Sequence, residues 1–200
     1  MDRLINIGLG LVISSLLGVI AYNLFWPQAE MDVSQPTPTE KIQDYISKID
    51  DALPLNQFAS AEAAVTEAMK IAIPIGGQEG PEVGKVLAKR GELRLRQGKK
   101  EEAEADYKHA LTIFEKTNLM EYESAQPVYV KLSDLYFKRE EFDKSEECLM
   151  RGLRQAEKAS DESAQARFWR AIALVKEKQG KSDEAEQCND KAARLTGRQR

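Results

Sequence analysis

The sequence predicts an all-α protein in which one membrane-spanning helix precedes a stack of four helical hairpins. Two observations lead to this prediction: a charge-free stretch near the start of the chain, and a pattern of small and bulky residues that recurs about every 42 residues through the rest. The 200 residues are 42% hydrophobic and 31% charged, so the chain has enough apolar side chains for one modest domain core.

The charge-free stretch runs from Leu4 to Trp26 and contains 23 residues. As a helix, at 1.5 Å per residue, it is longer than the ~30 Å hydrocarbon core of a bilayer. Tyr22, Phe25 and Trp26 cluster at its end, where aromatic rings favour the headgroup layer. We therefore expect a transmembrane helix at 4–26 after a short flank at 1–3. The alternative is a signal peptide cleaved before Tyr22, but the apolar run is longer than the usual signal core.

The residues on either side of this stretch predict its orientation. Arg3 precedes it, whereas no basic residue follows until Lys41 and acidic residues fill the gap. The positive-inside rule then places the N-terminus in the cytoplasm. We expect residues 37–200 on the non-cytoplasmic side, in a periplasm or a lumen.

Small residues recur along one stripe of the expected membrane helix, at Gly10, Ser14 and Gly18. Such a stripe allows a second membrane helix to approach closely. The alternative is that these are ordinary small residues in a helix that serves only as an anchor.

A short tether and a clear helix start follow the membrane segment. Residues 27–36 hold two prolines and several acidic residues without apolar periodicity, which is typical of a semi-extended linker. At Thr37–Glu40 the sequence combines an N-cap hydroxyl, a proline at the first helical position and a glutamate three residues after the cap. We therefore expect a helical domain over 37–200.

Four segments of this domain align when the chain is shifted by 42, 42 and then 40 residues. Small residues coincide at two positions seven residues apart: Ala61, Ala103, Ser145 and Ala185, then Ala68, Ala110, Gly152 and Ala192. A turn position and a bulky position also coincide: Asn56, Gly98, Glu140 and Gly180, then Tyr45, Leu87, Tyr129 and Trp169. Each unit is predicted to be a helical hairpin, with approximate bounds 42–75, 84–117, 126–159 and 166–196.

The segment GELRLRQGKKEEAEADYKHAL, residues 91–111, resembles the tetratricopeptide repeat. The next unit, residues 132–153, keeps the pattern but has Glu140 for the turn glycine and Ser145 for the helix-contact alanine. The 42-residue spacing and the connecting segment KIAIPIGGQEGPEV, residues 70–83, are similar to the extended repeats of the kinesin light chain type. The resemblance implies a right-handed α-solenoid whose first helices line a concave groove for a peptide or helix of a partner protein.

No group of residues in the sequence points to catalysis. Gly84–Lys85 lacks the spacing and the Ser or Thr of a phosphate-binding loop, and the paired glutamates at 101–102 and 140–141 fall in expected first turns of helices. His109 is expected on the surface. Cys148 and Cys188 share a register and are expected to be packing thiols. We therefore expect no enzyme, cofactor, metal or small-molecule substrate, and the net charge of −4 gives no reason to expect nucleic acid.

The family's groove register, transferred to repeats two to four, gives 18 positions, of which eight are basic and three are acidic. The candidate protein-binding residues among them are Lys85, Lys89, Leu95, Arg96, Val130, Lys131, Phe137, Lys138, Arg167 and Arg170. Leu95 and Phe137 would form an apolar strip between basic rims, which favours a partner segment with apolar and acidic side chains. In the alternative account the bases form a solvated face, and the C-terminal helix near Leu195 covers Phe137.

Together these features indicate a membrane-anchored scaffold that binds other proteins and assists the assembly, stability or quality control of a membrane complex. The alternative is a permanent structural subunit of a large membrane assembly, with the membrane helix packed through Gly10, Ser14 and Gly18.

Overall fold

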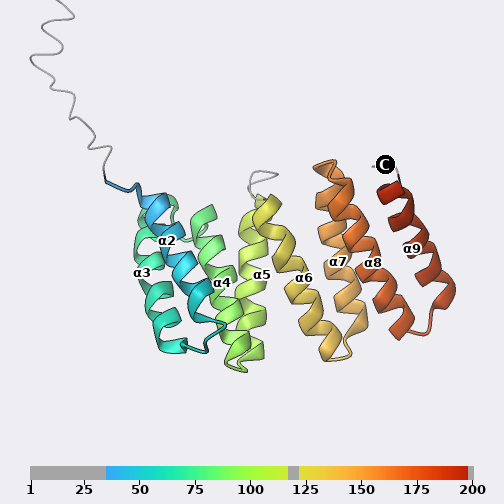
Figure 1. Cartoon of the computed structure of the whole chain (residues 1–200), viewed down its shortest axis with the longest axis horizontal. Helices are drawn as coiled ribbons and strands as arrows, with labels where there is room; N and C mark the ends of the chain where they lie inside the picture. The colour runs from blue at the N-terminus through green and yellow to red at the C-terminus, as the bar shows by residue number, and fades with distance from the viewer. Residues whose placement is uncertain (1–34, 117–121, 198–200) are drawn as a thin grey trace, which may run out of the picture. The chain divides into compact units, whose positions relative to one another are not determined.

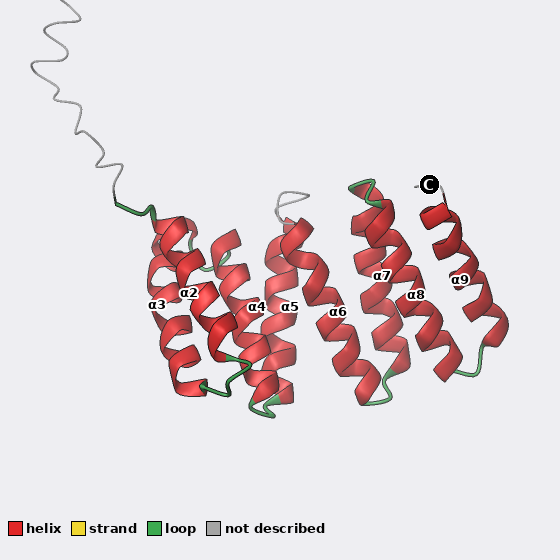
Figure 2. Ribbon diagram, viewed as in Figure 1, coloured by secondary structure: helices red, strands yellow, loops and turns green. Residues whose placement is uncertain are grey.

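The computed structural model describes residues 35–116 and 122–197, and these are built of helices and short turns. The described helices are α2 (Pro38–Ala52), α3 (Phe58–Gly76), α4 (Pro81–Arg96), α5 (Lys100–Lys116), α6 (Tyr122–Lys138), α7 (Phe142–Lys158), α8 (Glu162–Lys178) and α9 (Ser182–Gly197). They form four antiparallel hairpins, α2–α3, α4–α5, α6–α7 and α8–α9, which follow one another in a row (Figures 1 and 2). The second helix of each hairpin also packs against the first helix of the next.

The predicted membrane helix at 4–26, with Gly10, Ser14 and Gly18, lies outside the described residues, as do the flank at 1–3 and most of the tether. Within the described ranges, no helix combines the length and the apolar character that a membrane crossing requires.

The first helix begins as its sequence predicts. The Thr37 hydroxyl accepts a hydrogen bond from the Glu40 amide at 3.2 Å, and the Glu40 carboxylate accepts one from the Thr37 amide at 2.6 Å. Pro38 occupies the first turn, where its missing N–H leaves no bond unmade. This capping box confirms the predicted helix start at Thr37–Glu40.

The two small-residue positions are the places where helices of one hairpin touch, as the repeat pattern predicted. All eight of their residues are buried: Ala61, Ala68, Ala103, Ala110, Ser145, Gly152, Ala185 and Ala192. At Gly152 the space is filled from two sides, because an added Cβ would lie 3.1 Å from Tyr129 of the same hairpin and 2.6 Å from the ring of Phe168 in the next hairpin. Larger side chains at these positions would force the helices apart.

The predicted turn position also proves to be structurally equivalent in the four hairpins. Asn56, Gly98, Glu140 and Gly180 have φ angles of 55°, 79°, 59° and 77°. This left-handed conformation reverses the chain between the two helices of a hairpin. Glu140 adopts it without the freedom of glycine, because the helices on either side fix the path of the chain.

Two local expectations are corrected. The pair Glu140–Glu141 was expected in a first helical turn, but α7 starts at Phe142, with Glu140 in the left-handed turn and Glu141 at the N-cap. The segment at 70–83 was expected to connect two repeats, but α3 continues through Pro74 to Gly76. Pro74 is tolerated because it costs only one backbone bond in the last turn. The actual connection is only four residues long, from Gly77 to Gly80.

Candidate functional site

The first helices of the hairpins enclose two neighbouring hollows on one face of the row. A hollow of about 200 Å³ lies between α2, α4 and α6, and we name it the α2–α4–α6 hollow. A second of about 430 Å³ lies between α6 and α8, and we name it the α6–α8 hollow. The candidate residues that line them are Lys85, Lys89 and Lys131 in the first, and Val130 and Arg167 in the second. The structure thus brings half of the ten candidates together.

The basic side chains of the α2–α4–α6 hollow are paired with carboxylates of the chain itself. Lys89 contacts Asp50 of α2, and Lys131 Nζ lies 2.7 Å from Glu92 Oε1 on α4. Lys85 Nζ lies 3.0 Å from Glu82 Oε1, one turn earlier on the same helix. These pairs reduce the positive charge that the sequence register suggested for this half of the groove.

The α6–α8 hollow combines apolar surface with one arginine, Arg167. Val130 of α6 is 49% exposed and Leu174 of α8 is 50% exposed, with the smaller Ala171 near them on the same face of α8. Arg167 Nη2 donates to the side-chain oxygen of Gln126 at 2.7 Å. In residues 35–116 and 122–197, neither Arg167 nor Arg170 forms an ion pair with a carboxylate.

The strip expected from Leu95 and Phe137 is less open than the register suggests. Both side chains are only partly exposed and pack against the core. The Phe137 ring meets Phe142 of α7 edge to face, with 5.5 Å between ring centroids. The C-terminal helix α9 packs on α8, so Phe142, from the same hairpin, is the ring that partly covers Phe137.

The remaining candidates lie around the hollows. Lys138 Nζ is 2.6 Å from Asp134 Oδ2, one helical turn earlier. Arg96 is exposed at the end of α4, and Arg170 is exposed in the middle of α8. Among the groove positions, the large apolar side chains that are exposed are Val130 on α6 and Leu174 on α8.

Outside the groove, His109 and the two cysteines are placed as predicted. His109 is exposed, and its Nε2 atom lies 3.2 Å from Glu79 Oε1. Cys148 and Cys188 are buried free thiols. Burial raises the pKa of the Cys148 thiol to about 12, so it acts as a packing residue and not as a nucleophile.

Sequence reasoning missed a larger cleft of about 700 Å³ between α3 and α4, on the opposite face of α4 from the groove. Arg90, Leu93 and Arg94 of α4 line it. The signal was present in the repeat alignment, because repeat three has buried Leu132 and Tyr136 where repeat two has the two arginines.

Comparison with known proteins agrees with this architecture. Residues 84–117 and 126–158 match the tetratricopeptide repeat model, which is a scaffold fold that binds peptides and proteins. No curated protein sequence matches the chain.

Several solved structures share the fold at low sequence identity. BtubC (BKLC) from P. vanneervenii is 20% identical with a TM-score of 0.68, over 84% of this chain and 68% of that one. A putative kinesin light chain with nearly identical repeats from Podosopora anserina is 14% identical with a TM-score of 0.65, over 82% and 78%.

Aspartyl phosphate phosphatase F from Bacillus subtilis is 12% identical with a TM-score of 0.70, over 82% of this chain and 42% of that one. This chain therefore spans less than half the length of that protein. Residues 84–117 and 126–158 are thus similar to tetratricopeptide repeats, and the described helices share the fold of kinesin-light-chain-like repeat structures.

Proposed function

We propose that this chain is a membrane-anchored scaffold that holds a segment of a partner protein in the α6–α8 hollow. The observation that carries the proposal is half-exposed Val130, which lines the hollow with Arg167 and Ala171. Half-exposed Leu174 and exposed Arg170 lie on α8 within one helical turn of Ala171. Uncovered apolar surface beside two exposed arginines favours a segment that carries an apolar and an acidic side chain.

The two kinds of contact contribute differently. Covering a side chain such as Leu174 completely stabilises a complex by about 1.5–3 kcal/mol, and about half of that surface is still open here. Exposed arginines add little affinity, but they raise the association rate at low salt. Affinity should therefore follow the apolar residues, and salt dependence should follow the arginines.

The charge-free run at 4–26 supports attachment to a membrane, and Arg3 before it supports a helical domain on the non-cytoplasmic side. A tethered helical solenoid suits a factor for assembly, stability or quality control of a membrane complex. The stripe Gly10, Ser14 and Gly18 favours the second candidate, a permanent subunit whose membrane helix packs on others.

Site-specific photo-crosslinking in native membranes tests the groove. A crosslinker at position 130 or 174 should capture one partner, whereas a crosslinker at exposed Leu55, in the α2–α3 turn, should not. Val130→Asp should release that partner at any ionic strength, with Leu55→Asp as the matched control. If the Val130→Asp variant keeps every partner and the Leu55→Asp variant loses one, the groove is not the binding site.

The charged rim is tested by Arg170→Glu, with Arg154→Glu on α7 as the control. Arg170→Glu should slow association at low salt and have little effect at high salt. An equal effect of the two variants would assign the dependence to overall charge.

Fractionation tests the anchor and separates the two candidates. The full-length protein should resist carbonate and high-salt washing, and protease added to the non-cytoplasmic side should digest the repeat domain. Protection from that side would reverse the orientation. Release of the partner in mild detergent favours an assembly factor, whereas fixed stoichiometry through stringent purification favours a permanent subunit.

A further inference from the structure

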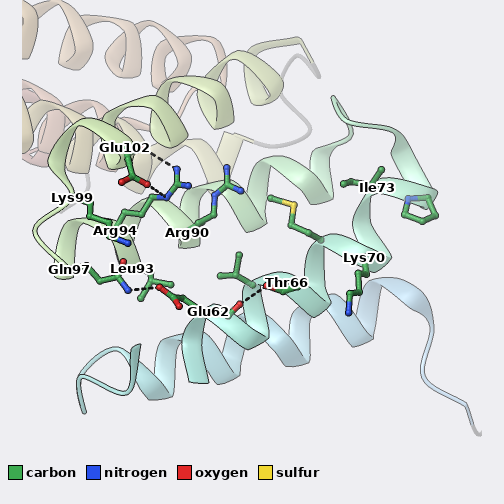
Figure 3. A pocket seen from close by; sticks show the side chains of 13 residues that line it. Glu62, Thr66, Lys70, Ile73, Arg90, Leu93, Arg94, Gln97, Lys99 and Glu102 are labelled. Carbon is green, nitrogen blue, oxygen red and sulfur yellow. Dashed lines mark hydrogen bonds and ion pairs between the residues drawn. The ribbon is translucent and has the colours of Figure 1, made fainter. Parts of the chain in front are cut away.

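The cleft between α3 and α4, named here the α3–α4 cleft, has an apolar floor and charged walls (Figure 3). Val65, Met69 and Leu93 form part of its lining, and Ile73 at one end is 42% exposed. Its volume of about 700 Å³ falls within the range of protein pockets that bind small segments or ligands.

The cleft exists because repeat two departs from repeat three at three equivalent positions. Repeat three carries Leu132, Tyr136 and Cys148 there, all buried, whereas repeat two carries Arg90, Arg94 and Asp106. Two core side chains are thus replaced by arginines that turn toward Asp106 in their own hairpin. The space that the core residues would fill against α3 stays open.

The arginines are held in fixed positions on the cleft wall. Asp106 is 3% exposed, and its Oδ1 and Oδ2 accept from Arg90 Nη2 at 2.7 Å and Arg90 Nε at 3.0 Å. Asp106 Oδ2 also accepts from Arg94 Nη1 at 2.8 Å. In the part of the chain that the structure describes, Arg90 Nη1 and Arg94 Nη2 make no hydrogen bond. These groups remain available to an incoming acceptor.

The charges that line the cleft favour an acidic ligand. Four basic side chains line it, from Lys70, Arg90, Arg94 and Lys99, against the two acidic ones of Glu62 and Glu102. Lys70 pairs with Glu67, Arg94 with Glu102 and both arginines with Asp106, so in the described residues Lys99 is the base of the cleft that forms no ion pair. Glu62 is engaged by the side-chain amide of Gln97 at 2.8 Å. A guanidinium held in a fixed position can bind a carboxylate, and the apolar floor beside it can bind an apolar side chain. A peptide that carries these two groups close together along its chain would fit both.

The geometry points to a second protein-binding site in the α3–α4 cleft, which takes a peptide segment with an apolar side chain within a few residues of a carboxylate. The site is independent of the groove, because α4 presents Lys85, Ala88 and Lys89 to the α2–α4–α6 hollow and Arg90, Leu93 and Arg94 to the cleft. The chain would then hold two partner segments on opposite faces of the row.

The probe is a library of short random peptides displayed on phage and selected on the full-length protein in detergent micelles. Enriched peptides should carry Asp or Glu within three positions of Leu, Ile, Met or Phe. One enriched peptide is then synthesised with a dye, with a Glu-to-Gln version beside it, and its dissociation constant is measured by fluorescence anisotropy.

The chain offers matched controls for both walls. Ile73→Asp and Lys99→Glu should each weaken the peptide by about tenfold or more. Ile75→Asp, at 48% exposure two residues away, and Lys100→Glu should change binding less than twofold, because neither residue lines the cleft. Melting curves identify any variant that loses its fold, and Lys99→Glu keeps the test valid if Ile73→Asp does.

Three outcomes would overturn the proposal. They are a selection that enriches no peptide, equal losses with Ile73→Asp and Ile75→Asp, or binding that depends on Val130 and not on Ile73. The last outcome would leave the groove as a binding site and remove the cleft, whereas failure of the groove variants alone would leave the cleft standing.

Discussion

Replacing Asp106 by Asn tests whether the buried carboxylate holds α4 and α5 together. The Asp106 side chain is 4% exposed and accepts three hydrogen bonds, from Arg90 Nη2 and Nε and from Arg94 Nη1. Asparagine keeps the shape and removes the charge, so two guanidiniums lose their common counter-ion. Its amide NH₂ would also point donors at donors.

Removing one partner of a buried ion pair costs about 3–5 kcal/mol. The side chains of Arg90 and Arg94 are 33% and 26% exposed, so water compensates for part of the loss. We expect a decrease of about 2–4 kcal/mol in the free energy of unfolding. For a domain of this size, that corresponds to a decrease of roughly 4–16 °C in melting temperature.

The assay is circular dichroism during heating and denaturant titration of the full-length protein. Because repeat arrays unfold in segments, hydrogen exchange of α4 and α5 should show the loss locally. The triple variant Arg90→Leu, Arg94→Tyr and Asp106→Cys carries the side chains of the next repeat and should regain most of the stability. An Asn variant within about 0.5 kcal/mol of the wild type would refute the reasoning.

Three further predictions concern single positions. Glu140→Gly should stabilise the protein by up to about 1 kcal/mol in denaturant titration, because glycine adopts the positive φ without strain, whereas Gly98→Ala should destabilise it. Partial burial acts to raise the pKa of Glu104, but bonds from Lys, Tyr and Arg side chains lower it to about 2 from 4.5. The Glu104 carboxylate therefore stabilises the fold at pH values above the pKa that it has in the unfolded chain. This stabilisation, roughly 3 kcal/mol, is lost as the pH falls from about 4.5 to 2. The Glu104→Gln variant should be less stable than the wild type at pH 6, and its stability should lack that part of the dependence on acid. Ala110→Glu should lower the melting temperature strongly, since a charge at a fully buried contact costs several kcal/mol. Ala105→Glu, at an exposed position of the same helix, should have little effect. Equal melting temperatures of the two variants would show that the repeat register is displaced.

The secondary structure was largely predictable because its signals are local. The capping box at Thr37 and the turn position at Gly98 act through backbone groups a few residues away. The segment 70–83, which was expected to connect two repeats, shows where such reasoning ends, because its first part is the end of α3. Packing of Ala68 and Ala72 on the neighbouring helices holds α3 together beyond a residue that locally disfavours a helix.

The groove was only partly predictable because the register fixes which side chains face it, but not what they contact. Val130 and Arg167, chosen by their spacing, line the α6–α8 hollow. The pairing of Lys131 with Glu92 and of Lys89 with Asp50 joins residues 39 positions apart on different helices, which no single-helix pattern reveals. The partial burial of Phe137 was likewise not predictable, because it comes from Phe142 on α7, which packs back against α6 after the turn.

The sequence by itself determined that residues 37–116 and 122–197 form helical hairpins, because small residues at a fixed period fit where two helices touch. Only the tertiary structure decided where the surface is open. An arginine at a core register can snorkel to water or turn to a buried acid, and the sequence does not distinguish these outcomes. Asp106 draws Arg90 and Arg94 into their own hairpin, and that choice, made between helices, opens the α3–α4 cleft.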